Sequence, residues 1–144
     1  MTTGNKEVAR RVFEEVWNNK KVAAIDELIA ANYIHHDAQS PSFPSGIEGY
    51  KQFVAYYLNA FPDVRFTIDN EVAEADMVVI RWTATGSHEG DLAELAPTGR
   101  HFSVTGITMA RLSDGKVAES WNSWDALGMM QQLGAVPEAR GRAA

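Results

Sequence analysis

The feature that most constrains the fold is the pair Asp114-Gly115, which stands between two alternating runs, RHFSVTGITMARLS and KVAESWNSW. An Asp-Gly pair in this setting is the strongest short-range signal for a β-hairpin, because both central residues of the tight turn adopt positive φ. With a two-residue loop, Ser113 lies opposite Lys116, and every later pair follows by counting. The sequence therefore predicts one long antiparallel hairpin around which the chain is organised.

This counting predicts which side chains of the hairpin share a face, because side chains along a strand alternate with period two. Trp121 falls opposite Thr108, and Asp125 lies further along the same face. Gly106 falls opposite Ser123, and two small residues leave a gap between these positions. A carboxylate near an indole, with space in front of it, indicates the floor of a pocket.

Composition limits the class of protein. The chain has 144 residues, of which 45% are hydrophobic, so we expect one domain over 1–134 and a flexible tail over 135–144. It contains no membrane-length apolar run and no signal-peptide centre, so we expect a cytoplasmic protein. The absence of cysteine excludes thiol catalysis, and a net charge of −6 argues against nucleic acid or an anionic membrane as partner. Four tryptophans suit a small apolar or aromatic metabolite, and the chain carries no cofactor motif.

The periodicity of the chain changes after Pro62. Apolar residues recur at helical spacing over 8–17, 22–29 and, most clearly, 47–61. NYIHHD at 32–37 is expected to be an extended piece, and from residue 64 onward the period is two. Three helices followed by four antiparallel strands predict an α+β domain, in which N-terminal helices pack on a curved, mainly antiparallel sheet. Such a half-open conical barrel encloses a cavity that is open at one end.

The other face of the hairpin is too apolar for solvent. Ile107, Met109 and Trp124 fall on it by the same counting. A contiguous apolar face on a small domain is usually covered by a partner, so we expect a homodimer joined through the outer face of the sheet.

Several phrases, in this order, resemble the SnoaL-like polyketide cyclases of the nuclear-transport-factor-two-like superfamily. They are YIHHD at 33–37, GIEGYKQF at 46–53, AFPDV at 60–64, VVIRWTATGSHEG at 78–90, PTGR at 97–100 and DGKVAESWNSWDALGMMQQLG from Asp114. The resemblance spans nearly the whole chain and implies the conical α+β barrel. The superfamily also holds isomerases, dehydratases, epoxide hydrolases, hydroxylases and non-catalytic binders, so the activity has to be argued from the site.

The candidate catalytic residues are Asp125, His88 and His36. The family's cyclases use an aspartate on the last strand as general acid and base, which supports Asp125, with a pKa raised by burial against Trp121. Asp125 can instead simply cap the helix that follows it. His88 or His36 would polarise an enolate oxygen. Equally, His88 can be bonded to a loop, and His36 can form a structural pair with Asp37.

Two further sets of residues bear on the site. A metal site built from His35, His36, Asp37 and His88 is conceivable, but adjacent histidines on an extended segment point to opposite faces, so we predict that no metal binds. Aromatic residues are expected to form the core and the substrate-binding wall together. They are Trp121, Trp82, Phe102, Tyr33, Phe53, Tyr57 and Trp17.

These residues favour a cofactor-independent, lyase- or isomerase-type cyclase. Asp125 would take a proton from a carbon between two carbonyls of an aromatic polyketide or ester and return it to the attacked carbonyl oxygen. The reaction is an intramolecular aldol condensation. Two alternative functions would use the same predicted cavity. One is a non-catalytic small-molecule binding protein, and the other is a hydrolase or hydroxylase with an altered proton relay.

Overall fold

A computed structural model of the protein describes residues 2–137. Its elements are α1 (Thr2–Arg11), the π-helix η1 (Val12–Asn18), the 3₁₀-helix η2 (Val22–Ala24), α2 (Ile25–Leu28), β1 (Ile29–Asp37), α3 (Ile47–Ala60), β2 (Arg65–Glu74), β3 (Met77–Ser87), β4 (His101–Ser113), β5 (Lys116–Trp124) and α4 (Ala126–Gln132). The part of the predicted tail over 138–144 lies outside the described residues. No helix within 2–137 is both long enough and apolar enough to cross a membrane.

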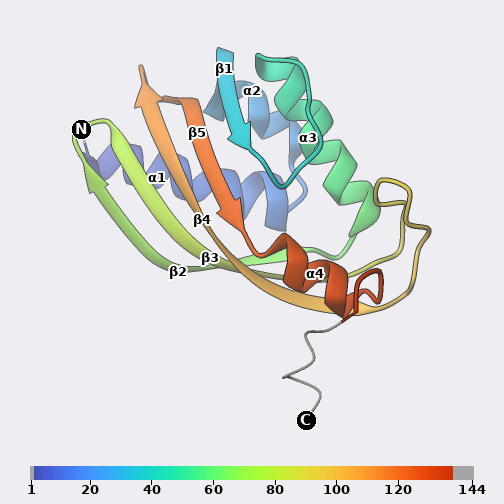
Figure 1. The fold of residues 1–144 in the computed structure, drawn as a ribbon. Helices are drawn as coiled ribbons and strands as arrows, with labels where there is room; N and C mark the ends of the chain where they lie inside the picture. The colour runs from blue at the N-terminus through green and yellow to red at the C-terminus, as the bar shows by residue number, and fades with distance from the viewer. Residues whose placement is uncertain (1, 138–144) are drawn as a thin grey trace.

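The five strands form one mixed sheet in the order β1-β5-β4-β3-β2. Strands β2 to β5 pair antiparallel, as predicted, and the extended piece around NYIHHD is a fifth strand that pairs in parallel with β5. The sheet bends strongly and the N-terminal helices lie along its concave side (Figure 1). The predicted α+β half-open barrel is therefore confirmed, with a sheet that does not close on itself.

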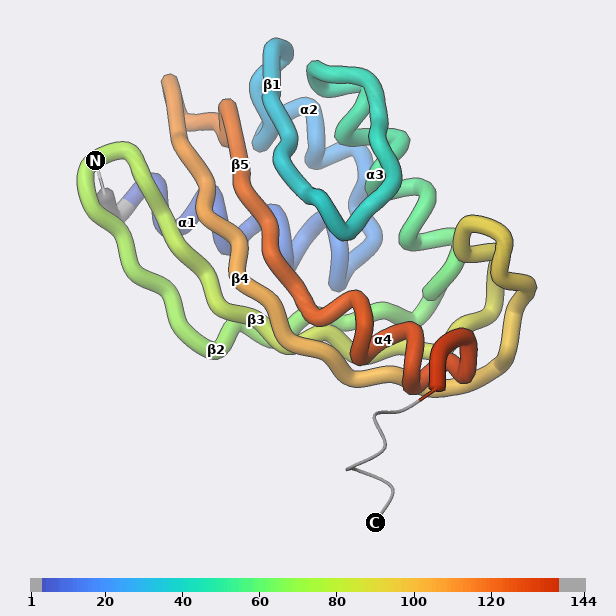
Figure 2. Tube along the Cα trace, viewed as in Figure 1, coloured from blue at the N-terminus to red at the C-terminus, as the bar shows by residue number. Residues whose placement is uncertain are grey.

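The helices cover the concave side because their apolar residues recur at helical spacing. Val12 and Val16 of η1 are buried, as are Tyr50 and Val54 of α3, and they pack in one core with the inner faces of the strands. Helix α3 ends at Ala60, just before Pro62, close to the predicted end. The Cα trace in Figure 2 shows β3 and β4 curving beneath these helices toward the yellow loop that joins them.

The hairpin departs from the predicted register at one residue. Leu112 pairs with Val117, as counted, but Arg111 then pairs with Glu119. Ala118 is therefore an extra residue in β5, a β-bulge. Val117 and Ala118 are both buried, which strict alternation along a strand does not allow.

Beyond this bulge the two faces of β5 are exchanged relative to the prediction. Asn122, not Trp121, lies opposite Thr108, and Trp124 lies opposite Gly106. The prediction that Trp121 and Asp125 share the inner face is therefore wrong. The inner face of β5 carries Ser120, Asn122 and Trp124 instead.

The outer face of the sheet keeps only part of its predicted apolar row. Ile107 and Met109 lie there with 47% and 36% of their surface exposed, whereas Trp124 faces inward. The homodimer through this face stays a prediction.

Gly106 lies in one row with Trp82 of β3 and Trp124 of β5. A Cβ atom added to Gly106 would lie 2.4 Å from the Trp82 ring and 2.7 Å from the Cβ of Trp124. The two tryptophans thus fill the space on the inner side of the glycine. Gly106, Ser123 and Asp125 do line a hollow, as predicted, but it lies on the outer face of the sheet and not in the cavity.

This packing predicts that Gly106→Ala destabilises the fold. The added methyl group must displace the Trp82 ring or the backbone, and overpacking of this kind costs about 1–3 kcal/mol. Urea denaturation measures the loss in the free energy of unfolding. Gly4→Ala in α1 is the matched control, because a Cβ there meets nothing within 4 Å. Equal stability of the two variants would contradict the packing described.

Candidate active site

A cavity lies between the concave face of the sheet and the helices. Its walls are mostly apolar and come from η1, β1, α3 and the inner faces of β3, β4 and β5. Among the described residues that line it, none is a lysine or an arginine. The polar side chains that reach it, tyrosines and Trp nitrogens aside, are His35, Asp37, Ser40, Thr108, Ser120 and Asn122.

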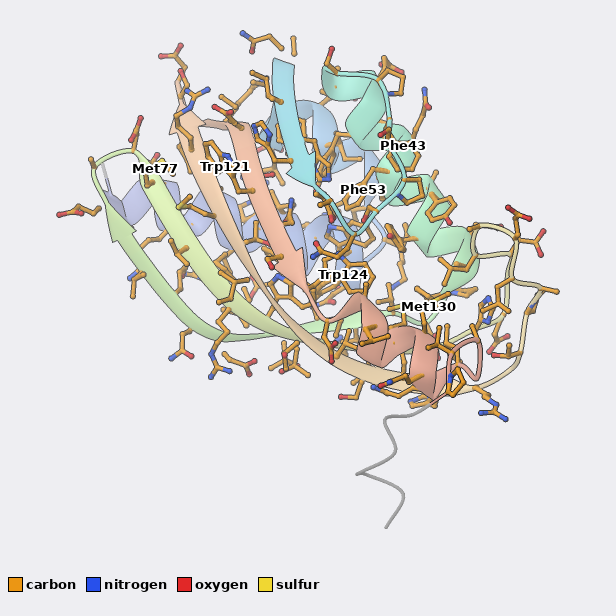
Figure 3. All side chains as sticks on the ribbon, in the orientation of Figure 1. Phe43, Phe53, Met77, Trp121, Trp124 and Met130 are labelled. Atoms are coloured by element: carbon orange, nitrogen blue, oxygen red, sulfur yellow. The ribbon has the colours of Figure 1, made fainter. Side chains whose placement is uncertain are left out.

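Most of the predicted aromatic wall lines this cavity. The members in place are Trp17, Tyr33, Phe53, Tyr57, Trp82 and Phe102. Trp121 is not among them, because the bulge turns it to the outer face, where it stacks on His36 with ring centroids 5.2 Å apart. Figure 3 labels Trp121 and Trp124 along β5, with Trp124 near the end of the strand. Trp124 is the tryptophan of β5 that lines the cavity.

Asp125 does not reach the cavity. It is exposed and acts as the N-cap of α4, where its Oδ1 accepts a hydrogen bond from the Gly128 N–H at 2.9 Å. The predicted position on the cavity floor is wrong because it relied on unbroken alternation along β5. The capping alternative describes what Asp125 does in the structure.

The two histidines predicted to assist Asp125 also lie outside the cavity lining. His36 is on the outer face, where its Nε2 lies 2.7 Å from Glu119 Oε2, and this hydrogen bond lowers the pKa of Glu119. His88 is completely buried, and its Nδ1 accepts a hydrogen bond from the Thr98 N–H at 3.2 Å. His88 is therefore bonded to the loop between β3 and β4, which is the structural alternative given above. His36 pairs with Glu119, and not with Asp37 as the structural alternative for that residue predicted.

Strand β1 supplies the ionisable groups of the cavity. Its parallel pairing with β5 sets His35 beside Ser120 and Asp37 beside Asn122, while His36 points the opposite way, as predicted for adjacent residues. The His35 and Asp37 side chains are 20% and 2% exposed. Their nearest atoms, Nε2 and Oδ2, are 3.9 Å apart, which is too long for a hydrogen bond but short for two ionisable groups.

Asp37 is held by donors from three directions. Its Oδ1 accepts from the Gln39 N–H at 3.0 Å and from Trp124 Nε1 at 3.3 Å, and its Oδ2 accepts from the Ser40 hydroxyl at 2.8 Å. Because the Ser40 hydroxyl donates its one proton to Asp37, the Tyr57 hydroxyl is the donor in its hydrogen bond with Ser40 Oγ, at 2.8 Å. These bonds satisfy the buried carboxylate and fix its orientation.

His35 has one satisfied and one free ring nitrogen. Nδ1 lies 2.6 Å from the Tyr33 hydroxyl, which in turn contacts the Ser120 hydroxyl. Nε2 is buried and has no hydrogen-bond partner among the described residues. The pKa of His35 is lowered, because the effect of burial outweighs that of the nearby Asp37, which raises it. The ring is therefore neutral near pH 7, where a general base has to be unprotonated.

The sequence carries a signal for this site that the predictions did not use. Tyr33, His35 and Asp37 alternate along one extended segment, and alternate positions of a strand share one face. Within residues 2–137, no group of three or more acidic or histidine side chains is placed to hold a metal ion.

A mostly apolar cavity with a few converging polar groups, between a curved sheet and its helices, defines a small-molecule binding or catalytic domain. The chain belongs to the family described as SnoaL-like polyketide cyclase, which matches residues 7–133. The resemblance predicted from the sequence phrases is therefore confirmed.

The chain is similar to two methyl ester cyclases at modest identity. Aklanonic acid methyl ester cyclase DnrD from Streptomyces peucetius is 29% identical over 131 residues, which cover 89% of each chain. Aklanonic acid methyl ester cyclase AcmA from Streptomyces galilaeus is 33% identical over 110 residues, or 72% of this chain and 76% of AcmA. The solved structure of TsrD from Streptomyces laurentii has a TM-score of 0.84 at 28% identity, covering 93% of this chain and 97% of TsrD.

The capping geometry predicts how Asp125 responds to substitution. Asp125→Ala should lower the free energy of unfolding by about 1 kcal/mol, whereas Asp125→Asn should change it by only a few tenths, because asparagine caps a helix about as well. Thermal and urea denaturation measure both. Ligand affinity of the cavity should stay at the parent value in Asp125→Asn, and a loss there would place Asp125 in the site after all.

Proposed function

We propose that this protein is a cofactor-independent cyclase that closes a ring of a neutral aromatic polyketide ester by intramolecular aldol condensation, with His35 as general base and acid. The observation that carries the proposal is the buried Nε2 of His35, which has no hydrogen-bond partner among the described residues and belongs to a cavity-lining ring whose pKa is lowered by burial. The inner face of the last strand offers no carboxylate for this task, since Ser120, Asn122 and Trp124 occupy it.

The charge of the cavity favours a neutral substrate. Asp37 is the one acidic side chain among the described lining residues, and no lysine or arginine accompanies it. A free substrate carboxylate would lose its hydration there without gaining a cation, which is strongly unfavourable. An ester avoids this cost. The names of DnrD and AcmA describe cyclases of a methyl ester, which supports the same substrate class here.

The first step is proton abstraction. The Nε2 lone pair of His35 takes a proton from the carbon between two carbonyl groups, leaving an enolate on the substrate and an imidazolium on the protein. Such a carbon is already acidic, so one positioned base is sufficient. The Asp37 carboxylate, 3.9 Å from Nε2, stabilises the imidazolium while it exists.

The second step forms the ring. The enolate carbon attacks a ketone carbonyl of the same molecule, the new C–C bond forms, and the carbonyl oxygen becomes an alkoxide. This alkoxide takes the proton from Nε2 of His35, which returns the imidazole to its neutral state. The product is an isomer of the substrate, and neither an oxidant nor a second reactant is consumed.

Deuterium exchange tests the proposal without the natural substrate. An aromatic β-keto ester such as ethyl benzoylacetate, followed by NMR in D₂O, should exchange its α-protons faster with the protein present. His35→Gln should reduce this acceleration by roughly 10²–10⁴-fold, the usual contribution of a general base. His36→Gln, on the outer face, is the matched control and should keep parent activity.

Two outcomes would contradict the proposal. Exchange at the parent rate in a folded His35→Gln variant would remove His35 from the chemistry. Binding of the ester without any exchange would favour the non-catalytic binding protein.

Conversion of aklanonic acid methyl ester to a product of unchanged mass and altered retention time would establish ring closure itself.

The lowered pKa of His35 predicts the pH dependence. Activity should stay constant near neutral pH and fall along an acidic limb whose midpoint lies below the ordinary histidine pKa of 6.5. Below 6.5 the unfolded chain takes up this proton before the folded protein does, so the free energy of unfolding should also decline there. His35→Gln should remove that share of the decline. A midpoint above 6.5 in the rate profile would contradict the assignment.

A further inference from the structure

We infer that Asn122 stabilises the substrate oxyanion in this cavity, through its side-chain NH₂ group. The inference rests on the proposed function, because the oxyanion is the enolate formed when His35 takes its proton. Three observations carry it: the hydrogen-bond chain that orients the amide, the position of Asn122 beside Asp37, and the charge of the cavity.

The orientation of the amide follows from a chain of three side chains. The Trp82 indole N–H can only donate, and it donates to Thr108 Oγ1 at 3.0 Å. Thr108 then has one proton to give, and its hydroxyl donates to Asn122 Oδ1 at 2.7 Å. The amide oxygen is thus an acceptor in use, which leaves the NH₂ group as the free end. No described residue accepts a hydrogen bond from it.

The strand register places Asn122 beside Asp37. Asn122 lines the cavity and is the register partner of Asp37, on neighbouring parallel strands. Such strands lie about 4.8 Å apart. His35 precedes Asp37 by two residues on the same face of β1, so in the proposed reaction a substrate bound at Nε2 would present a carbonyl oxygen to Asn122.

The charge of the cavity makes a neutral donor necessary. Once His35 holds the proton, its imidazolium faces the Asp37 carboxylate, and these two charges balance. The enolate then has no cation of its own, because no lysine or arginine is among the described lining residues. A carboxylate at position 122 would add a second negative charge beside Asp37. An amide with its oxygen already occupied presents only N–H donors, which is the arrangement an oxyanion requires.

Kinetic variants test this role. In the deuterium-exchange assay, Asn122→Leu should lower kcat by roughly 10²–10³-fold, the usual loss when one oxyanion donor is removed. Thr108→Val should give a smaller loss in the same direction, because Asn122 keeps its donors but loses the bond that aims them. Ser123→Ala, on the outer face of the same strand, is the control. Asn122→Asp with parent activity or more would overturn the inference, since position 122 would then tolerate an acid–base group.

A phenol gives a readout that does not depend on turnover. Bound 4-nitrophenol can pass its proton to His35 and then carries a negative oxygen, like the enolate, and its absorbance reports the ionised form. The parent protein should ionise it at a pH below its free pKa, and Asn122→Leu should shift the bound form back to the neutral phenol. Equal ionisation in both proteins would overturn the role of Asn122.

The two assays separate this inference from the proposed function. Exchange by the parent protein without any bound phenolate overturns the role of Asn122 alone, because His35 still works as a base. Neither exchange nor phenolate in the parent overturns both assignments. If both assignments are correct, the single variants His35→Gln and Asn122→Leu should each lose the bound phenolate. Unchanged circular dichroism shows that each variant is folded.

Discussion

The β-bulge at Ala118 determines which of the two alternating sets of β5 side chains faces the cavity. The composition of the site depends on it. Without the extra residue, Glu119 and Trp121 would point inward while Ser120 and Asn122 pointed out. Burying Glu119 would require a partner inside a cavity whose described lining has no cation. On the outer face, Glu119 instead bonds to His36 and Arg111. Burial of both Val117 and Ala118 adds apolar contact to the same register.

Two tryptophans join the packing of the cavity to its polar chemistry. Trp82 and Trp124 flank Gly106, and the missing side chain of the glycine lets them approach closely. The same two rings aim the polar groups, because Trp82 Nε1 starts the hydrogen-bond chain to Asn122 and Trp124 Nε1 donates to Asp37. A change at Gly106 would therefore disturb the geometry of the site as well as the stability of the fold.

Local patterns predicted the elements well and their relative placement less well. The turn at Asp114-Gly115, the inner face of β4 and the extent of α3 all follow from periodicity and turn chemistry, which act within a few residues. The bulge at Ala118 has a fainter signal, two successive apolar residues, and a count from the turn passes over it. The parallel pairing of β1 with β5 joins segments far apart in sequence, so the face that carries His35 and Asp37 could not be assigned locally.

The hydroxyl chain behind His35 decides which tautomer can act as the base. Abstraction at Nε2 needs a lone pair there, so the resting ring has to carry its proton on Nδ1 and donate it to the Tyr33 oxygen. Tyr33 then donates to Ser120, so the hydrogen-bond chain runs in one direction, from His35 Nδ1 to the hydroxyl of Ser120. Burial raises the pKa of Tyr33, so its hydroxyl keeps its proton when the imidazolium forms. The proton taken from the substrate consequently stays on Nε2, the nitrogen that faces Asp37, where the alkoxide formed by ring closure can take it back.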